Sequence, residues 1–98
     1  MKAVALISNN DDVKSNWQFD RVMAAISYDF DLSVIFMCDG YQQILNNKAW
    51  KCLSLYGVDH VYLYHDEAPS IIDNALFKVK SLSGTQLKQL VVNADIIL

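Results

Sequence analysis

Short apolar segments alternate with segments of helical periodicity along the whole chain. Residues 2–8, 32–38 and 60–65 predict buried strands, and residues 75–80 and 94–98 predict a fourth and a fifth strand. Such alternation is typical of a parallel sheet whose crossover helices cover it. The sequence therefore predicts an α/β fold, a three-layer sandwich with a mostly parallel five-stranded sheet and helices on both faces.

Helical patterns fill the intervals between these strands. Apolar residues recur at three- and four-residue steps from Asn16 to Tyr28, after the polar run "NNDDVKSN". A helix or helix pair is expected at 41–46 and 48–56, with Gly57 as its C-cap, and one helical turn is expected at 68–74. Ser83 and Gln86 have the spacing of a capping box at the start of the last helix.

Size and composition limit the classes of function. With 98 residues the chain predicts one domain spanning 1–98, and a 53% hydrophobic share predicts some apolar surface for another protein. A net charge of −3 with scattered lysines argues against direct nucleic-acid binding. No segment has the length of a membrane span or the pattern of a signal peptide, so we expect a cytoplasmic protein with no membrane contact.

Polar residues follow the predicted strands at the edge where sites of parallel sheets lie. The segments 8–12, 38–40, 65–67 and 80–83 converge there by topology. The residues Asp39, Gly40, His65 and Asp66 are therefore expected to line a cleft at the strand ends.

Cys38 is the one cysteine at such a strand end. Backbone amides of a following helix would favour its thiolate and make it a nucleophile or a sulfur carrier, whereas Asp39 beside it would oppose a negative charge. Cysteine is also a common filler of buried strands. Cys52, inside the second helical region, is expected to pack.

Other chemistry is disfavoured by the pattern of residues. The segment "HDE" at 65–67 has groups for acid–base work or a metal, but no second histidine cluster accompanies it, so no metal site is expected. The loop after the first strand has no glycine and two aspartates, which argues against a nucleotide cofactor. No cofactor of any kind is expected.

Three stretches together resemble a known family. The segments "VIFMCDGYQQIL", "YGVDHVYLY" and "SLSGTQLKQLVVNADIIL" are similar, in order and over nearly the whole chain, to the DsrE/DsrF/DsrH superfamily, and most closely to its TusC/DsrF branch. The chain is shorter than typical members of the branch before the first helix and around 65–75. Members do not generally place a cysteine at the position of Cys38.

The resemblance implies a subunit of a sulfur-relay complex. Such complexes are dimers of trimers built from three related subunits, and they pass persulfide sulfur to 2-thiouridine formation in tRNA or to sulfur oxidation. The relay cysteine lies after the third strand of the DsrE/TusD-type subunit, and the matching segment here, "HDEAPSII", contains none. A noncatalytic structural subunit, with DsrE/TusD-like and DsrH/TusB-like partners, is therefore the principal expectation.

Two alternatives stay open at this stage. In the first, the chain is a sulfurtransferase that carries persulfide on Cys38. In the second, it is a homo-oligomeric domain of the same fold that binds a small ligand at the strand ends.

Overall fold

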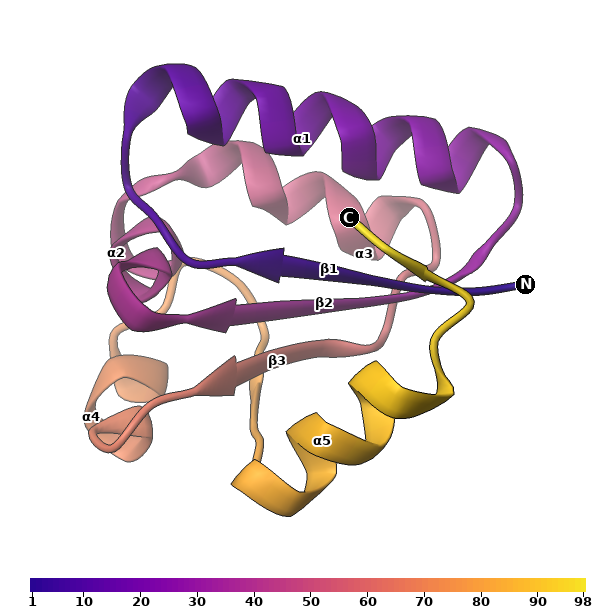
Figure 1. Cartoon of the computed structure of the whole chain (residues 1–98). Coiled ribbons are helices and arrows are strands. Elements are labelled where there is room, and N and C mark those ends of the chain that lie inside the picture. Colours follow the sequence, from indigo (N-terminus) through magenta and orange to yellow (C-terminus); the bar gives the residue numbers. More distant parts are fainter.

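The computed structural model describes residues 1–98 as a five-stranded sheet with helices on both faces (Figure 1). The strand order is β4-β3-β2-β1-β5, and every neighbouring pair is parallel. The strands are β1 (Lys2–Ile7), β2 (Asp31–Met37), β3 (Val61–Tyr64), β4 (Lys80–Ser81) and β5 (Ile96–Ile97). The predicted α/β sandwich is confirmed, and its sheet is wholly rather than mostly parallel.

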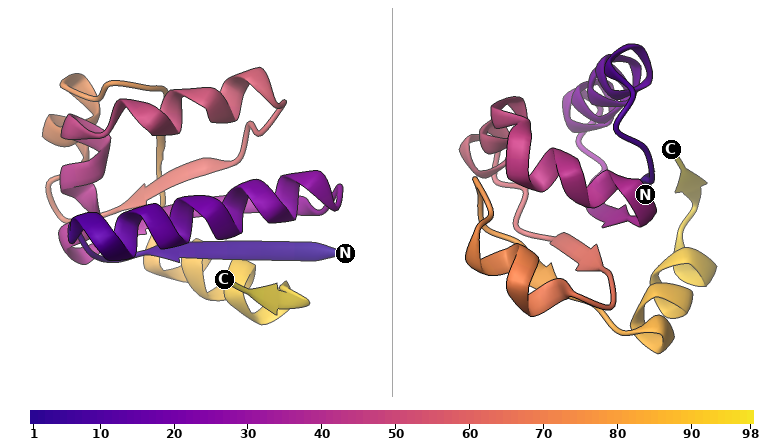
Figure 2. Two further views of the ribbon diagram at one scale, coloured as in Figure 1. Left: turned by 90° about the horizontal axis from the view of Figure 1, so that it is seen from above. Right: turned by 90° about the vertical axis from the view of Figure 1, so that its left-hand side faces the viewer.

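The helical elements connect these strands and lie in layers on the two faces of the sheet (Figure 1). They are α1 (Asp12–Ser27), η1 (Cys38–Gly40), α2 (Tyr41–Asn46), η2 (Lys48–Lys51), α3 (Cys52–Leu55), α4 (Ala68–Asp73) and α5 (Gly84–Asn93). In the view along the strands, α1 and α3 lie on one side of the sheet and α5 lies on the other (Figure 2).

One face of the sheet carries the main core. Alternate strand residues point to opposite faces, and the buried set on the first face packs against α1, α2 and α3. This set contains Ala3, Ala5, Ile7, Leu32, Val34, Phe36, Val61 and Leu63. Small residues on β1 let α1 approach closely, and the larger side chains of β2 and β3 fill the space below α2 and α3.

The opposite face has a much smaller core. Val4, Ile35 and Leu82 are buried there, with Leu87 and Leu90 of α5 packed against them. Helix α5 is the helix that packs on this cluster. Tyr64, at the carboxyl end of β3, is 39% exposed.

Trp50 forms the centre of an aromatic cluster on the first face. Its ring meets Phe36 and Phe19 edge-on, with centroids 5.4 and 5.1 Å away, and Phe77 packs on Phe36 at 5.6 Å. The side-chain oxygen of the buried Gln43 accepts a hydrogen bond from Trp50 Nε1 at 2.8 Å. The indole is thus fully buried with its single polar atom satisfied.

Several local predictions are confirmed in detail. Ser83 and Gln86 form both hydrogen bonds of a capping box at the start of α5. Gly57 follows the α3 turn with φ +76°, the left-handed conformation expected of a C-cap glycine. The turn predicted around Pro69 is α4.

The first helix begins four residues earlier than predicted. Helix α1 begins at Asp12 rather than Asn16, because the Asp11 side chain accepts a hydrogen bond from Lys14 N at 3.0 Å and caps the helix there. Residues 12–16 of the polar run therefore belong to the start of the helix, and residues 9–11 form the loop before it.

The predicted strand at 75–80 forms only at its end. Leu76 N donates to Ile44 O of α2 at 3.0 Å instead of to a strand, so the segment reaches β3 only at Lys80. Likewise, only Ile96 and Ile97 of the predicted strand 94–98 form β5. The alternating pattern predicted that these segments are extended, but it did not predict which backbone groups they bond to.

The Gln43 amide gives a test of this core. Replacing Gln43 with Leu leaves Trp50 Nε1 and Asn9 O without their partner, so we expect stability to fall by about 2–4 kcal/mol, since each buried unsatisfied group costs roughly 1–3 kcal/mol. Urea unfolding measures the loss. The matched control, the same change at the exposed Gln89 of α5, should stay within about 0.5 kcal/mol of the wild type. Equal stability of the two variants would contradict this account.

Candidate functional site at the carboxyl ends of the strands

Three of the predicted segments lie at one edge of the sheet. Residues 8–11 follow β1, residues 38–40 form η1 directly after β2, and residues 65–67 follow β3. Since β1, β2 and β3 are parallel neighbours, their ends lie side by side. The fourth segment, 80–83, contains β4 and the cap of α5, and it reaches the edge beside Tyr64.

Gly40 lies against the end of β1. A Cβ atom at this position would collide with the carbonyl group of Ile7, so a side chain larger than hydrogen does not fit. The φ angle of Gly40 is ordinary for a helix, at −60°. The glycine of the Asp-Gly corner is thus needed for close approach rather than for an unusual backbone angle, and its role in the site is to hold η1 on β1.

Cys38 stands at the turn from β2 into η1. Its φ is +51°, which is uncommon for a residue other than glycine, and Cys38 is exposed. Cys38 is therefore not a buried strand residue, and the interpretation of this cysteine as a packing residue is wrong. Asp39, also exposed, follows it at the start of η1.

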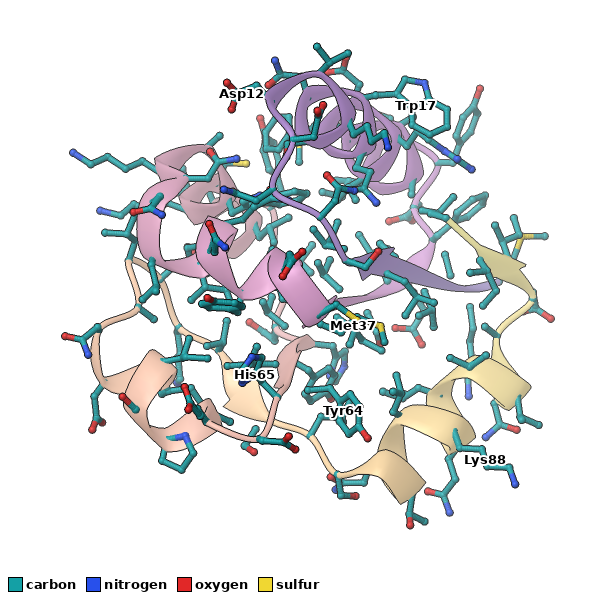
Figure 3. All side chains as sticks on the ribbon, turned by 60° about the vertical axis from the view of Figure 1, so that its left-hand side comes forward. Asp12, Trp17, Met37, Tyr64, His65 and Lys88 are labelled. Carbon is teal, nitrogen blue, oxygen red and sulfur yellow. The ribbon has the colours of Figure 1, made fainter.

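His65 occupies the corresponding position after β3. Met37 and Tyr64 are register partners, so Cys38 and His65 each come one residue after a matched pair. Figure 3 shows His65 on the side of the sheet toward α2 and α4, whereas Tyr64 points toward α5. His65 Nδ1 accepts a hydrogen bond from Glu67 N at 3.0 Å, so in the neutral ring Nε2 carries the proton.

Tyr41 packs on the His65 ring and was not anticipated as part of the site. The two ring centroids are 4.8 Å apart and the planes are tilted by 57°. Tyr41 is the first residue of α2, directly after the Asp-Gly corner. Its aromatic character was visible in the sequence, but nothing there indicated that the next strand end would bring a histidine onto it.

Side-chain amides fill the part of the edge nearest β1. Asn10 Nδ2 donates to Gln42 Oε1 at 3.0 Å, Asn9 Nδ2 donates to Gln18 Oε1 at 3.2 Å, and Gln43 Nε2 donates to Asn9 O at 2.6 Å. These bonds join polar groups of the loop to side chains of α1 and α2. The loop is fixed rather than open as a cradle for phosphate.

The acidic residues of the edge do not gather into a metal centre. Asp39, Asp66 and Glu67 are exposed, and nowhere in the chain do three histidine, cysteine, aspartate or glutamate side chains converge in a way that would hold a metal ion. The chemistry that the edge offers is that of an exposed thiol and an imidazole from neighbouring strands.

Cys52 has a different environment. It begins α3, is half-buried, and is free, as is Cys38. Burial raises the pKa of the Cys52 thiol above its ordinary value, although a backbone hydrogen bond acts in the opposite direction. A higher pKa means less thiolate at neutral pH and therefore lower reactivity.

The comparisons with known proteins show the fold. No family model and no curated protein matches the sequence. Among solved structures, the crystal structure of the YchN protein from E. coli is similar with a TM-score of 0.66. The similarity covers 100% of this chain and 98% of the YchN chain at 18% sequence identity. The two proteins therefore share one architecture from end to end.

Membrane insertion through a helix has no support in the structure. None of the helices has both the length and the apolar character needed to cross a bilayer.

The two cysteines should differ in reactivity. At pH 8, iodoacetamide should modify Cys38 several-fold faster than Cys52, because Cys38 is exposed while burial limits access to Cys52 and raises its pKa. Mass spectrometry of the two cysteine peptides at timed intervals gives both rates. In strong urea the two rates should converge; faster labelling of Cys52 in the folded protein would show that its environment is described wrongly.

Proposed function

We propose that this chain is a noncatalytic structural subunit of a cytosolic sulfur-relay complex, of the DsrE/DsrF/DsrH superfamily and its TusC/DsrF branch. In the proposed complex it joins DsrE/TusD-like and DsrH/TusB-like subunits in a dimer of trimers. The complex would serve 2-thiouridine formation in tRNA. The proposed chain binds neither the tRNA nor a cofactor itself.

The observation that carries the proposal is the segment between β3 and α4. Residues 65–72, "HDEAPSII", connect the end of β3 to the first turns of α4, where the resemblance implies that the catalytic subunit has its relay cysteine. No cysteine stands there in this chain. His65, the first residue of the segment, accepts a hydrogen bond at Nδ1 from the backbone amide of Glu67. A full-length fold match to YchN supports the superfamily without deciding the branch.

Exposed apolar side chains support a role in assembly. Seven large ones are more than half exposed. They are Met1, Val13, Trp17, Tyr28, Leu55, Tyr56 and Val92. Burial of such residues in subunit interfaces would remove apolar surface from water.

Native mass spectrometry tests the assembly. When the chain is produced together with its sister subunits, the expected species is a dimer of trimers that contains all three chains. The control is the chain produced alone, which should not form the same assembly. A solitary monomer in the presence of the sisters would overturn the proposal, and a homo-oligomer would favour the small-ligand-binding alternative.

A second candidate function is persulfide transfer by Cys38. Its exposed thiol at the end of β2, one strand from His65, favours this candidate. In that reaction a Cys38 thiolate attacks the outer sulfur of a donor persulfide. The donor leaves as a thiolate and Cys38 holds the sulfur as its own persulfide for the next acceptor.

Replacing Cys38 with Ser separates the two functions. For a structural subunit, sulfur transfer through the assembled complex should change less than twofold, because no transferred sulfur passes through Cys38. Radiolabelled sulfur delivered to tRNA measures the rate, and Cys52→Ser is the matched control. A loss of tenfold or more in Cys38→Ser alone, with the complex intact by native mass, would establish the sulfurtransferase.

A further inference from the structure

A groove lies at the end of the sheet opposite to the strand-end site. It has a volume of about 510 Å³ and opens between α3 and the segment that leads into β4. The partly exposed side chains of Val58, Leu76 and Phe77 form its apolar lining, and the fully buried Trp50 lies behind them. This volume falls in the range of pockets that hold small organic ligands.

Trp50 is held in one position behind the groove. Trp50 is held by its hydrogen bond to Gln43 and by edge contacts with Phe36 and Phe19. Its only polar atom is thereby used inside the core. Because Trp50 is 0% exposed, it supports the lining of the groove from within the core and does not itself touch a bound molecule.

The wall beside β4 is fixed at both ends. Leu76 N donates to Ile44 O at 3.0 Å, and Leu82 N donates to Leu63 O at 2.9 Å. Between these anchors the chain runs from α4 behind β3 to α5 (Figure 1). Such a wall does not need to form when a ligand arrives, which lowers the entropic cost of binding.

Three lysines surround the groove. In the sequence "FKVK" the buried Val79 points into the core, so the flanking Lys78 and Lys80 lie on the other side of the extended segment, where both line the groove. Lys51 lines it from the end of η2. Asp59 is the one carboxylate among the lining residues, so this region is positive on a chain with a net charge of −3.

We propose that this groove binds a small amphipathic anion, an aromatic or acyl group that carries a carboxylate or a sulfonate. The apolar part lies on Val58, Leu76 and Phe77, which are the partly exposed apolar residues of the lining. The anionic head lies among Lys51, Lys78 and Lys80. Lysine is suited to this task because its flexible stem can follow the head group while its ammonium remains at the solvent edge. The proposed site goes beyond the structural role above and is independent of Cys38.

The charged and apolar parts of the site are tested with two dyes. The first is 8-anilinonaphthalene-1-sulfonate, an aromatic anion that fluoresces in apolar surroundings, and the second is the uncharged N-phenyl-1-naphthylamine. For the double variant K78Q/K80Q, affinity for the anionic dye should fall at least fivefold, while affinity for the neutral dye should change less than twofold. The matched control K14Q/K88Q removes the same charge from α1 and α5, outside the groove, and should leave both affinities within twofold.

A blocking variant locates the dyes. Ser54 is an exposed lining residue of α3, and Ser54→Tyr places a ring at the groove, so both dyes should lose at least tenfold in affinity. Circular dichroism and urea unfolding establish that each variant is folded. Decanoate should displace the anionic dye from the wild type, since it likewise combines an apolar body with an anionic head.

Three results would overturn the proposal. These are equal loss of both dyes in K78Q/K80Q and K14Q/K88Q, binding that is unchanged by Ser54→Tyr, and displacement of the anionic dye by an acidic peptide but not by decanoate. The last result would assign the groove to a segment of a partner protein.

Discussion

The buried amide of Gln43 connects the elements on which the rest of the structure depends. It is 1% exposed, donates to Asn9 O of the β1–α1 loop, and accepts from Trp50 Nε1 at the start of the third helical region. Asn47 Nδ2 also donates to it, at 3.4 Å. A single side chain thus satisfies polar groups from two separate parts of the chain inside the main core. An apolar residue of equal size would fill the space but leave those groups without partners, so the amide specifies how the parts are arranged as well as stabilising them.

The same amide supports both the strand-end edge and the lysine-lined groove. Its Nε2 donates to Asn9 O in the loop at the carboxyl ends of the strands, and its Oε1 holds Trp50, which lies behind the lining of the lysine-lined groove. Gly40 adds a second constraint, because η1 can approach β1 only without a side chain at that position. The strand-end edge and the groove are therefore both built on fixed elements, which is what precise binding at either place requires.

Much of the fold could be predicted from the sequence because it depends on local pattern. The apolar runs of β1 and β2, the capping box at Ser83 and the glycine at position 57 each depend on a few neighbouring residues. Long-range pairing was less accessible. The segment 75–80 alternates like a strand, yet Leu76 bonds to α2, and only the fold itself decides that partner.

The site was predictable to the same extent. Parallel topology places Cys38 and His65 at one edge, and the sequence therefore identified the residues that lie there. It could not indicate that Cys38 is exposed with a positive φ, nor that Tyr41 packs on His65, because both follow from how η1 turns over the end of β1. That turn also separates the functions considered for the edge. With Gly40 against Ile7, η1 turns over the end of β1 and Cys38 is left exposed. An exposed thiol at this edge is compatible with persulfide transfer, and the cysteine-free β3–α4 segment is compatible with a structural role, so the two functions depend on different parts of the same edge.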